Sequence, residues 1–157
     1  MAGFLVHLLR HRELDGVSLD STERIRLHRA ILNRKVLLRR VYDSLHQTFV
    51  PFLRELPSGF CVELGTAWSH LEEVVPGLVR TDIAPVEGAA MQLDACRLPF
   101  KEASLAGIFM IHTLHHIPDA ESALKEAMRV LKPGGLMMLV EPHLTPWTLC
   151  IWGISGY

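Results

Sequence analysis

Acidic side chains interrupt or follow three short apolar runs in the second half of the chain. Glu63 lies in the first run and precedes Gly65, Asp82 ends the second run, and Asp94 follows the third. A carboxylate accepts hydrogen bonds from hydroxyl and amino groups, and a glycine lets a ligand approach the backbone where a side chain would intrude. A carboxylate inside an apolar run needs partners, and ligands of open α/β sheets collect at the strand ends, so these positions are candidates for a ligand site. The alternative for Asp82 and Asp94 is that they are turn or cap residues.

Histidines form a second group of candidate functional residues. His112 follows a fourth apolar run, His115 and His116 come soon after it, and His143 lies further on, close to Glu141. A metal site would need His112 and His115 on one helical turn, whereas the sequence there is typical of a loop, so we expect no metal ion. An imidazole can accept a proton near neutral pH. His112 is therefore the candidate general base, with His116 as the alternative.

The segments that carry these residues alternate between apolar runs and helical or turn sequences. The runs are nearly continuous in apolar residues, which is typical of parallel strands that are buried on both faces and connected by helices. They are Phe60 to Leu64, Gly77 to Ile83, Met91 to Leu93, Leu105 to Ile111 and Leu136 to Val140. Asp119 to Leu131 has the apolar spacing of a crossover helix, which Lys132-Pro133-Gly134-Gly135 should end in a turn. The sequence predicts an α/β, Rossmann-like fold with a mostly parallel sheet of about five strands and flanking helices.

The first third of the chain has the pattern of a helical segment. Asp20 and Glu23 resemble a capping signal, and helix-forming residues continue to about Leu53. One face is apolar, and basic residues occupy most of the remainder, which we interpret as a solvated helix surface rather than one that binds phosphate or nucleic acid. The apolar positions are Leu27, Ile31, Leu38, Val41, Leu45, Phe49 and Phe52. We expect a helical segment over residues 1–56 and the Rossmann-like domain over residues 57–157.

Composition argues against several classes of partner. Sixteen Lys and Arg against seventeen Asp and Glu give a net charge of -1, which provides no reason to expect nucleic acid or an anionic membrane as a partner. No apolar stretch approaches the roughly 18 residues of a membrane span. The apolar run Gly3 to Leu9 lacks the flanking features of a signal peptide, and the three cysteines form no C-x-x-C pair. We therefore expect a cytoplasmic protein.

The polar and glycine-containing segments occur in the order of a known family. They are Glu63-Leu64-Gly65, Asp82, Asp94 to Phe100, Leu114 to Asp119, Arg129 to Gly135 and Glu141-Pro142. Over roughly residues 58 to 147, this order resembles the methyltransferase type 11 group of class I S-adenosylmethionine (SAM)-dependent methyltransferases. The resemblance implies SAM as cofactor and a small molecule as methyl acceptor. A nicotinamide-dependent dehydrogenase is disfavoured, because the G-x-G-x-x-G fingerprint is absent.

The resemblance also implies a role for each candidate residue. The turn after the first strand would approach the carboxypropyl part of SAM, and Asp82 would accept hydrogen bonds from the ribose hydroxyls. Asp94 would accept from the adenine amino group, and His112 would face the cofactor and the substrate. The implied cofactor-binding residues are Glu63, Gly65, Thr66, Ala67, Asp82, Ile83, Asp94 and Ala95.

The sequence departs from the family pattern in two places. The family reads acid-x-Gly-x-Gly-x-Gly, but only Gly65 is present; Ala67 would fit if its φ were negative, and Trp68 places a large ring beside the cofactor. The family domain also has more strands than the five expected here. The fifth strand would then be an exposed sheet edge. The apolar segment Leu144 to Tyr157 could fold back over it as a helix, or a homodimer could form through either the strand edge or this segment. The alternative to an active enzyme is a catalytically silent methyltransferase-like protein that acts through self- or partner association.

Overall fold

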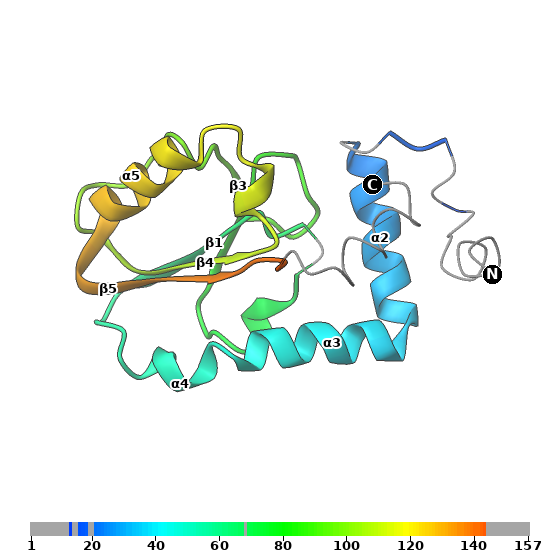
Figure 1. Ribbon diagram of the computed structural model, residues 1–157, viewed down its shortest axis with the longest axis horizontal. Coiled ribbons are helices and arrows are strands. Elements are labelled where there is room, and N and C mark those ends of the chain that lie inside the picture. The colour runs from blue at the N-terminus through cyan, green and yellow to red at the C-terminus, as the bar shows by residue number, and fades with distance from the viewer. Residues whose placement is uncertain (1–12, 14–15, 19–20, 68, 144–157) are drawn as a thin grey trace.

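The centre of the molecule is a five-stranded parallel sheet with helices on both faces (Figure 1). The computed structural model describes residues 13, 16–18, 21–67 and 69–143. The strand order is β3-β2-β1-β4-β5, so the chain starts at the centre, moves to one edge, and then returns past β1 to the other edge. This is a doubly wound arrangement. The predicted α/β, Rossmann-like fold is confirmed.

Continuous apolar runs form the central strands. The strands are β1 (Phe60–Leu64), β2 (Val79–Asp82), β3 (Met91–Gln92), β4 (Leu105–Ile111) and β5 (Leu131–Val140). Every residue of β4 is buried, because this strand lies between β1 and β5 and is covered on both faces. In the register of the sheet, Val62 pairs with Val79 on one side and with Ile108 on the other. The predicted bounds of β1 and β4 are confirmed.

The helical part of the chain is divided more finely than predicted. The helices are α2 (Thr22–Arg34), α3 (Val36–Gln47), α4 (Val50–Leu53) and α5 (Ala120–Val130), with single 3₁₀ turns η2 (Leu71–Glu73) and η3 (Leu114–His116). The predicted helical segment contains a break that the sequence analysis did not specify, because Lys35 adopts extended backbone angles (φ -100°, ψ 95°) between α2 and α3. Ser21 caps α2 by accepting a hydrogen bond from the Arg24 amide at 3.2 Å. Asp20, the predicted cap, lies outside the described residues.

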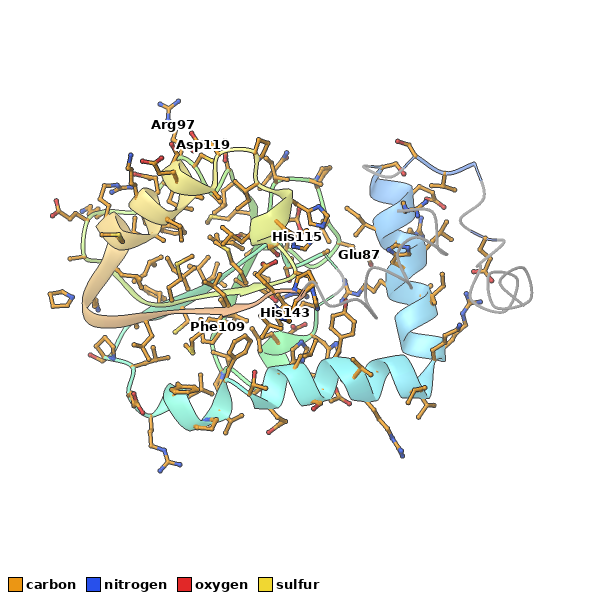
Figure 2. The ribbon with its side chains drawn as sticks, in the orientation of Figure 1. Glu87, Arg97, Phe109, His115, Asp119 and His143 are labelled. Atoms are coloured by element: carbon orange, nitrogen blue, oxygen red, sulfur yellow. The ribbon has the colours of Figure 1, made fainter. Side chains whose placement is uncertain are left out.

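Two apolar clusters fill the space between the sheet and its helices. On one face, Phe49 packs edge-to-face on Phe109 of β4, with ring centroids 5.4 Å apart, and Leu71 of η2 belongs to the same cluster (Figure 2). On the other face, Ala127 and Val130 of α5 pack against the sheet. Of the apolar positions predicted for the first helical segment, Ile31 and Phe49 are buried, whereas Val41 and Phe52 are 48% and 47% exposed.

Two connections differ from the expected pattern. α5 ends at Val130, close to its predicted end, and β5 begins directly after it at Leu131. The predicted turn residues Lys132 to Gly135 lie within the bounds of β5 but pair with no residue of β4: they form an irregularity between Leu131, which pairs with Leu105, and Leu136, which pairs with Gly107. The connection between β1 and β2 comprises residues 65–78, and its described residues form no helix other than η2. A parallel crossover usually carries an α-helix. The segment that follows β1 is therefore short, and side-chain contacts rather than a crossover α-helix hold it in place.

Two expectations concern residues that the structure does not describe. Trp68 and the segment Leu144 to Tyr157 lie outside the described residues, so the predicted ring beside the cofactor and the predicted contact through that segment remain predictions. β5 forms one edge of the sheet, and its Leu139 is 39% exposed. None of the described helices is long and apolar enough to cross a membrane.

Candidate functional site

The carboxyl ends of the parallel strands meet at one edge of the sheet. The turn after β1, Asp82 at the end of β2, the segment after β3 and His112 after β4 all lie at this edge. α2 stands beyond the same edge (Figure 1), where Arg29 donates a hydrogen bond from Nη1 to the carbonyl oxygen of Glu87 at 2.6 Å. The fold therefore gathers the predicted site residues at the position where open α/β sheets bind ligands.

The turn after β1 begins with a glycine that packing requires. Gly65 has a φ of +73°, and a Cβ at this position would lie 2.4 Å from Cγ2 of Thr113, which follows β4. Ala67, two residues on, has a φ of +31°. An alanine would fit the family's turn only at a negative φ, so Ala67 does not meet this condition. An alanine in this conformation carries strain of about 1 kcal/mol or more.

Glu63 supports the same turn from within the core. Its side chain is fully buried, and its Oε2 accepts a hydrogen bond from the Thr66 hydroxyl at 2.7 Å. The buried Arg80 donates from Nε to Thr66 Oγ1 at 2.8 Å and from its other nitrogens to Glu72 Oε1 and the Ser69 carbonyl, both at 3.0 Å. Its Nε lies 4.0 Å from Glu63. Burial outweighs this charge and raises the pKa of Glu63 from 4.5 to about 7.

Asp82 also contributes to the turn. Its Oδ2 accepts a hydrogen bond from the amide of Ala67 at 2.9 Å, and its Oδ1 accepts one from the amide of Ala84 at 2.9 Å. The carboxylate is nearly buried, but each of its oxygens has a second lone pair. The neighbouring Ile83 is 68% exposed. A hollow of about 360 Å³ follows it, lined by Ala84, Pro85, Val86, Glu87, Ala89, Met91 and Gln92.

Asp94 and Ala95 lie after β3, as predicted. Asp94 is exposed, and its Oδ1 accepts a hydrogen bond from the amide of Cys96 at 2.8 Å, which stabilises a turn. Ala95 is half-buried and packs against the apolar cluster under α5. The local structure thus gives Asp94 the role of a turn residue, while its exposed carboxylate still faces water.

His112 has a strained backbone and a half-buried ring. Its φ is +52°, and its amide donates a hydrogen bond to the Val140 carbonyl at 2.8 Å, which ties the end of β4 to β5. Burial lowers the pKa of His112 below 6.5, although Glu141 nearby favours the protonated ring. The neutral imidazole therefore predominates at pH 7 and can accept a proton.

Glu141 organises the loop that follows His112. Its Oε1 accepts hydrogen bonds from the amides of Thr113 and Leu114, at 3.0 Å and 2.8 Å, and its Oε2 lies 2.5 Å from Nδ1 of His115. Figure 2 shows His115 and His143 at the end of the sheet that faces α2. Glu141 is therefore a positioning residue for the loop.

A further polar group was not predicted from the sequence. His70 Nε2 lies 2.9 Å from Asp43 Oδ1, and the His46 and His70 rings are in edge contact with centroids 4.4 Å apart. Burial lowers the pKa of His46 to about 4. The ring of Tyr42 lies 6.2–6.5 Å from the rings of His46, His70 and His112. In the sequence, only the spacing Asp43-x-x-His46 indicates this group, because it places both side chains on one face of a helix. The contact with His70 depends on the tertiary fold.

Comparison with known proteins identifies part of the chain. Residues 72–139 match the family described as a methyltransferase domain. The 27-O-demethylrifamycin SV methyltransferase of Amycolatopsis mediterranei is 40% identical over 53 residues, which are 34% of this chain and 20% of that protein. The demethylmenaquinone methyltransferase of Streptomyces griseus is 40% identical over 55 residues, 35% of this chain and 24% of that protein. The match therefore spans about a quarter or less of these curated relatives.

Solved structures share the fold at low sequence identity. A Methanococcus maripaludis protein assigned as a SAM-dependent methyltransferase has a TM-score of 0.60 at 16% identity, over 80% of this chain and 68% of that one. The YcgJ protein of Bacillus subtilis has a TM-score of 0.54 at 19% identity, over 66% and 53% of the two chains. The [4+2]-cyclase SpnF has a TM-score of 0.53 at 18% identity, over 63% and 44%. Residues 72–139 of the chain therefore resemble a methyltransferase domain, and the fold of the described residues is one that solved class I methyltransferase structures share.

Proposed function

We propose that this chain binds SAM at the carboxyl edge of its sheet and transfers the methyl group to a small-molecule acceptor. The observation that carries the proposal is the placement of Gly65, Asp82 and Asp94 at the carboxyl ends of three neighbouring strands, in a chain whose residues 72–139 match a methyltransferase domain. The rifamycin and menaquinone methyltransferases among its relatives are named for small-molecule acceptors. Both observations support an acceptor of the same general class here.

The residues after β2 and β3 fit the nucleoside half of SAM. Asp82 retains one lone pair on each oxygen after accepting two backbone amides, so it can also accept from the two ribose hydroxyls. The exposed Ile83 offers an apolar surface to one face of the adenine ring, next to the hollow after β2. Asp94 is exposed and can accept from the adenine amino group.

The turn after β1 fits the methionine half less well. Gly65 has no side chain, but Thr113 fills the space where its Cβ would lie. Ala67 has a Cβ where the family pattern has a glycine, and its amide already donates to Asp82. Glu63 lies under the turn and is occupied with Thr66. In our proposal, Gly65, Thr66 and Ala67 contact the methionine part through their backbone, and Glu63 acts by holding Thr66 in place.

His112 is the proposed general base. SAM supplies a methyl group on a sulfonium sulfur, and an acceptor that must lose a proton needs a neutral base beside it. His112 follows β4 at the carboxyl ends of the strands, where the ligand is proposed to bind. Burial lowers its pKa, so its ring can take this proton at neutral pH. An acceptor without such a proton needs positioning alone.

Calorimetric titration of the chain with SAM and with S-adenosylhomocysteine tests the proposal. We expect saturable binding of one ligand per chain. Asp82→Ala should abolish it, because the ribose hydroxyls lose their acceptor, and Asp82→Asn should weaken it less. Absence of heat at millimolar ligand would overturn the proposal, and unchanged affinity in Asp82→Ala would refute the role of this residue.

A second pair of variants tests the turn itself. Ala67→Gly should tighten SAM binding, because it relieves the positive φ and removes the Cβ from the cofactor side. Ala103→Gly is the matched control: Ala103 also has a positive φ, +50°, but lies in the loop before β4, away from the ligand edge. Equal effects of both variants on SAM affinity would attribute the gain to general stability rather than to the site.

The same turn favours a second candidate, a silent methyltransferase-like protein that acts by association. Only one of the family's three turn glycines is present, and the Ala67 amide is already paired with Asp82. The fold is compatible with other activities, since it is shared with a protein named as a [4+2]-cyclase. This candidate gains support if neither the parent chain nor Ala67→Gly binds SAM while sedimentation shows a dimer.

A further inference from the structure

We propose that Asp43, His46 and His70 bind a divalent transition-metal ion, with Zn²⁺ as the first candidate. Asp43 and His46 lie one turn apart on α3, and His70 immediately precedes η2. One potential ligand atom from each residue lies within 4.8 Å of the other two. The inference concerns residues outside the SAM site and does not rest on the proposed methyl transfer.

His46 provides the independent reason to expect a ligand. Its side chain is fully buried, and neither ring nitrogen has a hydrogen-bond partner among the residues that the structure describes. A buried polar group without a partner is destabilising, and such groups are rare in folded proteins. A metal ion between His46 and His70 would give one of these nitrogens its partner.

The geometry is close to that of a tetrahedral site. Ligand atoms about 2.0–2.1 Å from a tetrahedral ion lie roughly 3.4 Å from one another. His70 Nε2 and Asp43 Oδ1, now 2.9 Å apart, would separate slightly, and the widest pair would close by at most roughly 1.4 Å from the 4.8 Å limit. Rotations of side chains on an otherwise unchanged backbone can supply these shifts.

The ligand set selects the metal by its chemistry. Two imidazoles and one carboxylate, with no thiolate, suit Zn²⁺ and neighbouring first-row ions rather than Mg²⁺ or Ca²⁺, which prefer oxygen. Arg39 donates from Nε to Asp43 Oδ1 at 3.1 Å and also pairs with Glu73. Its guanidinium would orient the carboxylate as an outer partner of the ion.

The position of the site gives it a structural consequence. His70 follows the turn after β1, whereas Asp43 and His46 belong to α3, so a bound ion would join the helix to the segment that replaces a crossover helix. The Tyr42 ring borders His46, His70 and also His112 at the ligand edge. Metal binding should therefore raise the thermal unfolding midpoint of the chain.

Zinc titration of the chelator-treated full chain, in competition with a chromophoric zinc chelator, tests the proposal. We expect one Zn²⁺ per chain, and Co²⁺ should give the visible absorption of a tetrahedral site. Asp43→Asn, His46→Leu and His70→Asn should each weaken binding by more than about 100-fold, beyond the roughly 10–100-fold effect of altering an outer partner. His46→Leu keeps the buried volume and removes both unpaired nitrogens, so it should fold without metal.

His115→Asn is the matched control, because His115 also pairs with a carboxylate, that of Glu141, but is exposed at the strand ends. It should leave the affinity unchanged. Failure of the parent chain to bind either metal in excess would overturn the proposal, as would unchanged binding in all three ligand variants. Loss of binding in His115→Asn alone would place the ion at the strand-end histidines and equally overturn it. Zinc should raise the unfolding midpoint of the parent but not of His46→Leu.

Discussion

Glu63 should make the stability of this protein depend on pH in an unusual direction. Burial raises its pKa from 4.5 to about 7, and the only cation near it, Arg80 at 4.0 Å, is already hydrogen-bonded to three other acceptors among the described residues. The folded state therefore binds this proton more tightly than the unfolded chain does. The stabilising effect is fully present below pH 4.5 and is lost as the pH rises towards 7.

The magnitude follows from the size of the pKa shift. A difference of roughly 2.5 units at about 1.4 kcal/mol per unit gives roughly 3 kcal/mol as the destabilisation caused by ionised Glu63. Glu63→Gln removes the charge while keeping the shape and the acceptor for the Thr66 hydroxyl. The free energy of unfolding of the variant, relative to that of the parent, should thus rise by about 1–3 kcal/mol between pH 5 and pH 8.

Urea unfolding followed by far-UV circular dichroism at several pH values measures this difference. All other groups titrate alike in both proteins, so their contributions cancel in the difference between the two free energies of unfolding. Glu55→Gln, which removes an exposed carboxylate, provides the baseline and should show no such rise. A difference that stays flat, or that falls as the pH rises, would refute the reasoning, because it would mean that Glu63 is ionised in the folded state and paired with Arg80.

Two further predictions concern backbone positions. Gly65→Ala should destabilise the protein by about 2–4 kcal/mol, because strain at positive φ adds to the clash with Thr113, whereas Gly134→Ala, at a φ of +78° with no atom within 4 Å of its Cβ, should cost about 1 kcal/mol. Chemical denaturation measures both, and equal losses would contradict the close approach to Thr113. Asp119→Ala removes the carboxylate that accepts from the Ser122 amide and hydroxyl at the start of α5, so the thermal midpoint should fall by a few degrees. Asp119→Asn should keep the thermal midpoint close to that of the parent. An unchanged midpoint in Asp119→Ala would show that the cap is dispensable.

The sheet could be predicted from the sequence because its central strands are apolar on both faces. Phe60 to Leu64 and Leu105 to Ile111 have no competing pattern, and their predicted bounds agree with the structure. The break at Lys35 could not be predicted, since neither glycine nor proline marks it. Lys132 to Gly135 has the composition of a turn, and these residues form an irregularity between Leu131 and Leu136, whose partners in β4 are Leu105 and Gly107. The composition thus predicts the irregular backbone, whereas pairing with β4 on either side of it places it within the strand.

The site was predictable in its positions and not in its contacts. Asp82 and Asp94 follow their strands as expected, but the partners of Asp82 are the amides of Ala67 and Ala84, which only the folded turn brings to it. Arg80 precedes Asp82 by two residues within an apolar run, and its burial gave no separate signal in the sequence. His70 is 27 residues from Asp43, and no local spacing predicts their contact.

The turn after β1 links these observations. Where the family pattern has its second and third glycines, this chain has Ala67 and Ser69. Glu63, Arg80 and Asp82 hold this turn through hydrogen bonds to Thr66, Ser69 and Ala67. A ligand at this edge must therefore share Asp82 with the Ala67 amide or displace that amide, so binding should strengthen when the amide is freed. In the proposed function, the fold and the turn would thus make separate contributions: the strand order would set where SAM binds, and the side-chain network under the turn would set how tightly it binds.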